Sequence, residues 1–168
     1  MQVISRSLNQ TLKIGKKIAA SLCTGDIICL FGELGSGKTA LVKGIAQGLG
    51  INKEQVVSPS FVLLRAYAKA KLPLYHFDLY RLKAAQDIRG LGYEEYFYAQ
   101  GVSVIEWADR LGYFLPQECL KIELFHKSKA QRLLKFSASG SRYRQLLKEI
   151  GSPRPSLKAQ NKIGGRAG

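Results

Sequence analysis

A glycine-rich segment has the residue types and the spacing needed to hold a chain of phosphates. It follows the pattern GxxxxGK[ST] in full. Glycines let backbone amides approach a phosphate closely, and a helix that begins at the lysine directs its free N–H groups at the anion. We therefore expect nucleotide binding by eight residues of this loop: Gly32, Glu33, Gly35, Ser36, Gly37, Lys38, Thr39 and Ala40.

Two side chains of this loop have chemical roles of their own. The ammonium of Lys38 is expected to reach the β- and γ-phosphates, which makes it a catalytic as well as a binding residue. The hydroxyl of Thr39 is expected to ligate Mg²⁺.

A magnesium–nucleotide site also needs a carboxylate at the end of a neighbouring strand. Asp78 and Glu106 each end a short apolar run that is typical of a strand. We assign Glu106 to the metal, and Asp78 to the γ-phosphate side as a catalytic and nucleotide-binding residue, although the two roles could be reversed. Each carboxylate could instead be structural, capping a turn or pairing with Arg81 or Arg110.

Four further residues near these motifs have two interpretations each. His76 lies two residues before Asp78 and shares its strand face, so it is either a packed histidine or a hydrogen-bond partner of the site. Trp107 follows Glu106 and is expected to point to the opposite side of the strand end, as a core or a binding residue. Ser58 and Ser60 stand where many nucleotide hydrolases carry a γ-phosphate switch, or form a plain turn.

Hydrophobic periodicity predicts the elements that position these residues. Residues 11–22 have the spacing of an amphipathic helix, residues 26–31 form a continuous apolar run typical of a strand buried on both faces, and a helix follows the glycine loop as far as Gly50. Later strands are predicted at 61–67, 72–77, 101–106, 120–125 and 133–136, with short helical pieces at 86–98 and helices from 107 and at 142–150. This alternation of strands and helices indicates an α/β fold.

Length and composition limit the classes of protein that the chain can belong to. Its 168 residues, 46% hydrophobic and 23% charged, suit one globular domain, which we place at residues 1–150. No apolar stretch approaches the roughly 18 residues of a membrane span, so no membrane partner is expected. Because the first residues lack the pattern of a signal peptide, we expect a cytoplasmic protein.

The positive charge is concentrated in the last third of the chain. Residues 121–168 hold 12 basic and 2 acidic residues, and residues 151–168 are expected to form a basic tail. This asymmetry indicates contact with a polyanion, which could be RNA, an acidic protein or a phosphate-rich surface. A solvated tail without a partner explains the charge equally well.

Five segments in a fixed order resemble one family of proteins. They are residues 32–39, 58–61 (Ser-Pro-Ser-Phe), 75–81 (Tyr-His-Phe-Asp-Leu-Tyr-Arg), 91–97 (Leu-Gly-Tyr-Glu-Glu-Tyr-Phe) and 105–107 (Ile-Glu-Trp). Their order and spacing resemble the bacterial ATPases of tRNA threonylcarbamoyladenosine biosynthesis, the TsaE family, over roughly residues 5–137. The phosphate loop is shared by many families, whereas the other segments are much more specific.

The resemblance implies a P-loop NTPase-like, three-layer α/β sandwich with a mixed, mostly parallel sheet. It implies a weak Mg²⁺-dependent ATPase that acts in the formation of N6-threonylcarbamoyladenosine at position 37 of tRNA. The partners it implies are TsaB and TsaD, which carry out the transfer, and the cofactors are ATP and Mg²⁺. By motif, Lys38 and its loop bind phosphates, Thr39 and Glu106 hold Mg²⁺, and Asp78 supports hydrolysis.

The sequence departs from the family pattern at two positions. Ala40 replaces a usual hydroxyl residue near the α-phosphate, and Ser60 replaces a usual threonine. The alternatives to an accessory ATPase are a small-molecule kinase and an RNA-binding module switched by a nucleotide. The resemblance implies ATP rather than GTP, and the chain contains no guanine-reading Asn-Lys-x-Asp segment.

Overall fold

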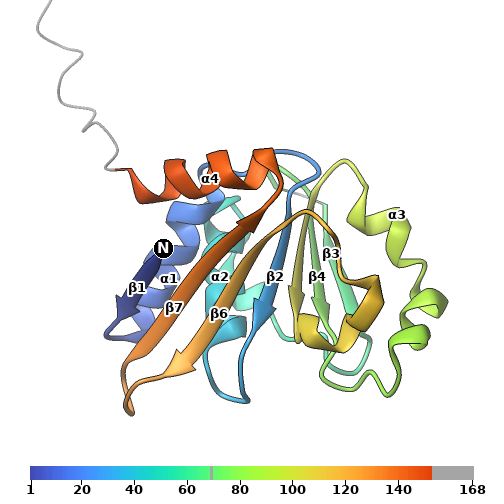
Figure 1. Cartoon of the computed structure of the whole chain (residues 1–168), viewed down its shortest axis with the longest axis horizontal. Coiled ribbons are helices and arrows are strands. Elements are labelled where there is room, and N and C mark those ends of the chain that lie inside the picture. The colour runs from blue at the N-terminus through green and yellow to red at the C-terminus, as the bar shows by residue number, and fades with distance from the viewer. Residues whose placement is uncertain (69, 153–168) are drawn as a thin grey trace, which may run out of the picture.

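A computed structural model describes residues 1–68 and 70–152 of the chain. In this part, seven strands form one sheet in the order β1-β7-β6-β2-β5-β4-β3 (Figure 1). The central strands β6, β2, β5 and β4 run parallel, and the outer pairs β1–β7, β6–β7 and β3–β4 are antiparallel. The strands are β1 (Gln2–Ser5), β2 (Ile27–Phe31), β3 (Leu64–Tyr67), β4 (Leu74–Asp78), β5 (Val102–Glu106), β6 (Cys119–His126) and β7 (Arg132–Ser139). The predicted mixed sheet with a parallel centre is confirmed.

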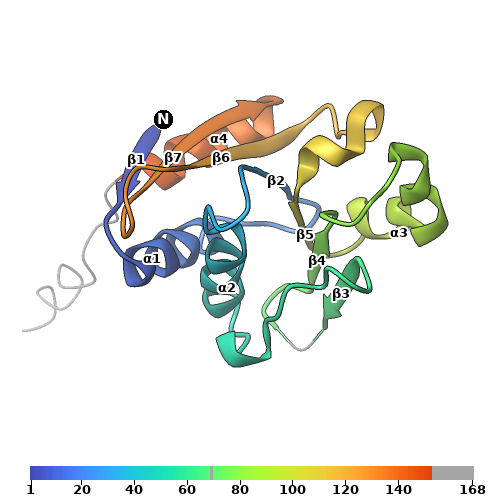
Figure 2. The same cartoon turned by 90° about the horizontal axis from the view of Figure 1, so that it is seen from below.

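Helices lie on both faces of this sheet and make three layers (Figure 2). One apolar cluster joins the sheet to α1, α2 and α4, and a second joins it to η2, α3 and η3. The α-helices are α1 (Leu8–Ala19), α2 (Lys38–Gly48), α3 (Tyr93–Phe97) and α4 (Ser141–Gly151), and the 3₁₀ helices are η1 (Lys53–Gln55), η2 (Ala85–Leu91) and η3 (Ala108–Phe114).

Strand β2 lies at the centre of both clusters, as its continuous apolar sequence predicts. Ile28 and Leu30 pack into the first cluster, whereas Ile27 and Cys29 pack into the second. Alternate residues of a strand point to opposite faces, so a strand buried on both sides needs an uninterrupted apolar run. The loop that follows β2 is thereby fixed to the most rigid part of the sheet.

Two glycines bring α1 directly against α2. A Cβ atom on Gly44 would lie 2.4 Å from the carbonyl oxygen of Leu12, and one on Gly15 would lie 2.6 Å from that of Leu41. Neither contact is possible for a larger residue without moving backbone. The close packing holds α2, which begins at the phosphate loop, against the N-terminal helix.

The structure corrects the predicted boundaries in three places. Helix α1 begins at Leu8, earlier than expected, because the Ser7 hydroxyl accepts a hydrogen bond from the Gln10 N–H and caps the helix. Strand β1 was not predicted, since a four-residue edge strand carries little periodicity of its own. The predicted hairpin is present as β3 and β4, which are shorter than the two apolar stretches.

Within residues 1–68 and 70–152, no helix has the length and apolar character needed to cross a membrane. The predicted basic tail at 151–168 lies outside the described residues, apart from its first two.

Candidate functional site

The phosphate loop connects the end of β2 to the start of α2. Gly32 has a φ of 140°, and a Cβ there would lie 2.4 Å from the carbonyl oxygen of Leu124 on β6. Gly37 caps α2 with a φ of 103°, in the left-handed region. Both positions therefore require glycine, for a close approach in one case and for the backbone conformation in both. The free N–H groups of α2 point into the loop, as phosphate binding requires.

A cavity of about 350 Å³ opens at the N-terminal end of α2. It is lined by the phosphate loop, by Ser58 and Ser60, by the two strand-end carboxylates and by Trp107. The side chains of Asp78 and Glu106 lie side by side because these residues are paired in register across the parallel strands β4 and β5. Parallel strands bring their carboxyl ends to one edge of a sheet, where ligands bind in open α/β folds.

Lys38 is almost completely buried in the wall of this cavity, with 4% of its surface exposed. Its Nζ donates hydrogen bonds to the carbonyl oxygens of Gly32 (2.7 Å) and Glu33 (2.9 Å) and lies 3.8 Å from the ring centroid of Trp107. Desolvation lowers the pKa of the ammonium, while the nearby charges of Glu106 and Asp78 oppose that shift. No carboxylate forms an ion pair with this lysine in the described structure, so its charge is directed at the loop.

Glu106 is held by a hydrogen bond at each of its two oxygens. The Thr39 hydroxyl lies 2.9 Å from Oε2, and Nε2 of His76 lies 2.8 Å from Oε1. His76 and Glu106 are both fully buried or nearly so. Of the two interpretations of His76, the structure thus combines both, since it is a packed residue that is hydrogen bonded to a candidate metal ligand.

Asp78 is bonded to the loop between η1 and β3. Its Oδ2 accepts hydrogen bonds from the hydroxyls of Ser58 and Ser60, the latter at 2.6 Å, and its Oδ1 accepts from the Tyr80 N–H at 3.0 Å. The two serine hydroxyls also lie 2.7 Å from each other. Residues 58–60 are therefore not an independent turn, because they are joined to the carboxylate that lines the cavity.

Trp107 corrects one prediction. The ring was expected to face away from Glu106, but it lies over Lys38 in the same cavity. Strand β5 ends at Glu106, and Trp107 adopts a left-handed conformation with a φ of 58°, which breaks the alternation of a strand. The ring of Tyr80 packs against it, with the centroids 5.0 Å apart.

The predicted binding residues do not all line the cavity. Gly35, Gly37, Lys38, Thr39, Ala40, Asp78 and Glu106 do so. Gly32 and Glu33 line a neighbouring cavity of about 220 Å³ and contact Lys38 through their carbonyl oxygens. Ser36 is fully buried, and its hydroxyl has no hydrogen-bond partner among the described residues.

Three residues of the site were not singled out from the sequence. Leu34 at the tip of the loop and Tyr80 line the cavity. Arg132 at the start of β7 reaches the loop, with its Nη2 3.5 Å from the Gly35 carbonyl oxygen. Tyr80 belongs to the motif around Asp78 and could have been found there, whereas only the register of β7 reveals Arg132.

The residues present suit a nucleotide and a magnesium ion. Lys38 offers a cation and α2 its free N–H groups at one end of the cavity, and the loop behind them holds the unpaired buried hydroxyl of Ser36. Thr39 and Glu106 offer the oxygen ligands that Mg²⁺ prefers, and such ions usually complete their shell with phosphates and water. The donor set therefore fits the Mg²⁺ and ATP expected from the sequence.

The strand, glycine loop and helix, set in a parallel sheet centre with paired carboxylates at the strand ends, define a protein of P-loop architecture. Comparisons with known proteins narrow this class. The family model described as "Threonylcarbamoyl adenosine biosynthesis protein TsaE" matches residues 5–134. The chain therefore belongs to the TsaE family.

Individual relatives agree with this assignment. The chain is 42% identical to the tRNA threonylcarbamoyladenosine biosynthesis protein TsaE of Bacillus subtilis over 141 residues, which cover 84% of this chain and 87% of the relative. The protein of the same name from Treponema pallidum is 42% identical over 124 residues, 74% of this chain and 90% of that one. The crystal structure of Bacillus subtilis YdiB superposes with a TM-score of 0.77 at 37% identity, over 90% of this chain and 93% of that one.

Proposed function

We propose that this chain binds and hydrolyses ATP with Mg²⁺ and that this activity supports the formation of threonylcarbamoyladenosine in tRNA by TsaB and TsaD. The observation that carries the proposal is the arrangement of Lys38, Thr39 and Glu106 around one cavity at the start of α2. Membership of the TsaE family supports the pathway, and the names of the relatives support tRNA as the molecule that is modified.

The residues of the cavity have separate tasks in this proposal. The loop N–H groups and Lys38 bind the β- and γ-phosphates, and Lys38 stabilises the charge that develops during transfer. Thr39 and Glu106 would hold a Mg²⁺ ion, which would neutralise phosphate charge. His76 keeps Glu106 in place through Oε1, so that the carboxylate cannot turn away from Thr39.

Asp78 is the candidate for positioning the attacking water. Both of its oxygens already accept hydrogen bonds from the protein, two of them from Ser58 and Ser60. A carboxylate that exchanges these hydroxyls for a water would release the 58–60 loop. Asp78 would then couple hydrolysis to the position of that loop, and its work as a base and as a sensor would be linked.

Exposed apolar residues around the cavity support a protein partner. Leu34, Phe61 and Val62 are 71%, 84% and 60% exposed, and they belong to the phosphate loop and to the segment that follows Ser60. Apolar side chains grouped beside a site are typical of a surface that another protein covers. We propose that TsaB and TsaD dock here, where the partner contacts both the nucleotide loop and the segment bonded to Asp78.

Steady-state ATP hydrolysis tests the proposal most directly. The purified chain and its Lys38→Ala variant are compared with Mg²⁺, in the presence and absence of TsaB, TsaD and tRNA. We expect slow turnover by the chain alone, faster turnover with the partners, and none in the variant. A Phe61→Ser variant is expected to keep the basal rate and to lose the stimulation.

Two outcomes would contradict the proposal. If TsaB, TsaD and tRNA do not change the hydrolysis rate, the proposed accessory role is wrong. Phosphate found on a small metabolite in place of free phosphate would indicate a kinase.

A further inference from the structure

Within residues 1–68 and 70–152, no helix lies over half of one sheet face. The second apolar cluster lies under η2, α3 and η3 and covers the β4 and β5 side of this face, whereas β6, β7 and β1 are open on it (Figures 1 and 2). Leu120, Ile122 and Leu134 point to the other face, into the first cluster, so their neighbours in sequence point outward. We call this surface the open face, and its side chains include Phe31, Lys121, Glu123, Phe125, Leu133 and Lys135.

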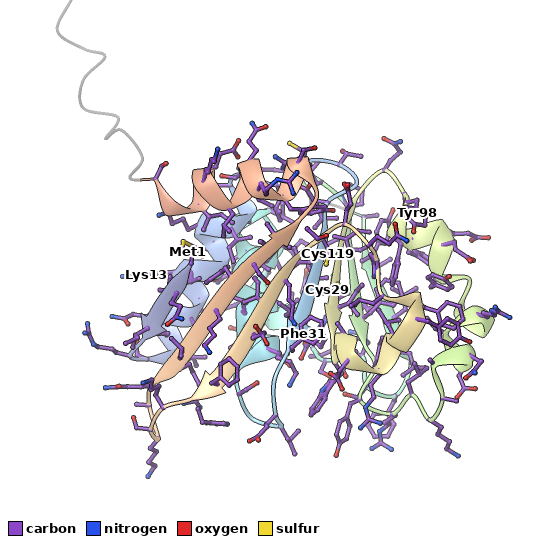
Figure 3. All side chains as sticks on the ribbon, viewed as in Figure 1. Met1, Lys13, Cys29, Phe31, Tyr98 and Cys119 are labelled. Carbon is purple, nitrogen blue, oxygen red and sulfur yellow. The ribbon has the colours of Figure 1, made fainter. Side chains whose placement is uncertain are left out.

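Two aromatic rings on the open face each have a lysine ammonium above them. Lys121 Nζ lies 4.5 Å from the ring centroid of Phe31, and Lys135 Nζ lies 5.0 Å from that of Phe125. Phe125 is 41% exposed and lies near the end of β6, two residues beyond the last residue that pairs with β2. Phe31 lies at the border between the covered and the open part of the face (Figure 3).

The hairpin that forms most of the open face carries an excess of positive charge. Residues 119–139 contain five basic residues and one acidic residue. Lys121 and Lys135 lie on the open face and Lys127 and Lys129 lie in the turn between β6 and β7, whereas Arg132 reaches the phosphate loop. The acidic one, Glu123, lies 3.7 Å from Lys121 and neutralises part of one charge.

We propose that the open face binds single-stranded RNA, with bases stacked on Phe125 and Phe31 and with Lys121 and Lys135 each leaving the ring that it covers to bind a phosphate. A sheet that presents aromatic rings between cations is a platform for unpaired bases, since every base has a flat face and every linkage a negative charge. A duplex would satisfy only the cations. A protein partner fits less well, because the centres of protein interfaces are depleted in lysine.

RNA binding by the full-length chain tests the charge part of this proposal. The probes are a fluorescein-labelled tRNA anticodon stem-loop and a labelled RNA duplex of equal length, measured by fluorescence anisotropy across a salt series. The Lys121→Gln/Lys135→Gln variant is expected to bind the stem-loop about 10-fold more weakly and to lower the salt slope by about 1 to 2.

A matched variant controls for the general loss of charge. Lys13→Gln/Lys16→Gln removes two exposed cations from α1, which covers the other face of the sheet. Its affinity for the stem-loop is expected to stay within about 2-fold of the wild-type value, because phosphate contacts act locally. Equal weakening by both double variants would overturn the proposal.

A second pair of variants tests the stacking part. Phe125→Ala is expected to weaken binding of the stem-loop about 10-fold and to leave duplex binding within about 2-fold, because only unpaired bases stack on a ring. Phe125→Trp should retain the affinity. A Phe125→Ala variant that binds both RNAs as the wild type does, with an unchanged melting temperature, would overturn the stacking platform.

Other functions of the open face predict different results for the same variants. If the lysine variant keeps its RNA affinity but loses self-association in sedimentation, or loses binding to TsaB and TsaD, the face is a protein interface and the proposal is wrong. ATP hydrolysis measured on the same variants separates this inference from the proposed function. The Lys38→Ala variant is expected to bind RNA normally.

Discussion

The two ends of strand β2 both bury charged residues, but they treat the charges differently. At the N-terminal end, Asp26 is 2% exposed and accepts two hydrogen bonds from the Arg142 guanidinium, at 2.9 and 2.6 Å. At the C-terminal end, Lys38 is 4% exposed and is bonded to carbonyl oxygens, with Glu106 and Asp78 close by but occupied elsewhere. We call these the paired end and the phosphate end.

This difference between the two ends distinguishes buried charges that stabilise the fold from buried charges that can bind a ligand. A buried ion pair satisfies itself and offers nothing to a ligand, and removal of one member leaves the other uncompensated. A buried cation without a carboxylate partner keeps its charge available for a phosphate. Its lowered pKa records the cost of that burial. We therefore expect mutations at the phosphate end to affect activity and mutations at the paired end to affect stability.

Lys38→Met should give the largest effect on activity. We expect ATP hydrolysis to fall about 100- to 1000-fold, as when one donor to transition-state charge is removed. The free energy of unfolding should change little at pH 7, because two effects oppose each other. The variant loses the hydrogen bonds to Gly32 and Glu33, but it also loses an ammonium whose pKa burial keeps below its ordinary value of 10.5 in the folded state. The second effect should shrink as the pH rises toward 10.5. Steady-state kinetics and urea unfolding at both pH values measure these effects, and a large loss of stability would break the comparison.

Arg142→Met should give the largest effect on stability. Asp26 would stay buried without its partner, and we expect the free energy of unfolding to fall by about 2–3 kcal/mol, less than for a fully buried pair because the Arg142 side chain is 30% exposed. The affinity for ATP should not change. Urea unfolding and nucleotide titration measure the two quantities, and the Asp26→Asn/Arg142→Met double variant should recover part of the loss. A loss of ATP affinity without a loss of stability would contradict the assignment of the paired end.

Glu106→Gln sharpens the comparison within the phosphate end. The amide can still accept the Thr39 hydrogen bond at 2.9 Å but has no charge for a cation. We expect the Mg²⁺ concentration for half-maximal hydrolysis to rise about 10- to 100-fold. His76→Gln, which can still donate to Oε1, should have a smaller effect in the same direction. An unchanged Mg²⁺ dependence in the Glu106 variant would transfer the metal role to Asp78.

Tyr143→Phe should give the smallest effect, at the paired end. The Ile27 N–H donates to the Tyr143 hydroxyl at 2.8 Å, and we expect the variant to lose about 1 kcal/mol of unfolding free energy at pH 7. Burial raises the pKa of Tyr143 to about 12, so the folded state favours the neutral phenol. That contribution is complete below pH 10 and is lost as the pH rises toward 12. The melting temperature should therefore fall less steeply between pH 10 and pH 12 in the variant than in the wild type. An identical fall in both proteins would contradict this role of the Tyr143 phenol.

Local signals were sufficient to predict the centre of the molecule. The glycine loop, the buried strand before it and the helix after it follow one another within residues 26–50, and the structure has them in that order. Asp78 and Glu106 were recognised as strand-end acids because a buried run interrupted by a carboxylate is visible in the sequence. Their roles remain predictions until they are tested by mutation.

Features that join distant segments were not predictable in this way. The position of Trp107 over Lys38 depends on one left-handed residue after β5, and strand periodicity alone indicated the opposite side. Strand β1 exists because it pairs with β7, more than a hundred residues later, as the bond between Met1 and Phe136 illustrates. A short edge strand has no pattern that distinguishes it from a loop.

The amino-acid sequence by itself determined the phosphate loop, because glycine conformation and helix N-termini act over a few residues. It also determined which strands are buried on both faces, since a continuous apolar run allows no other place for them. Only the tertiary structure decided which charges are paired. Asp26 meets Arg142 across 116 residues and Thr39 meets Glu106 across 67, and such contacts depend on sheet order and register, which no local pattern encodes.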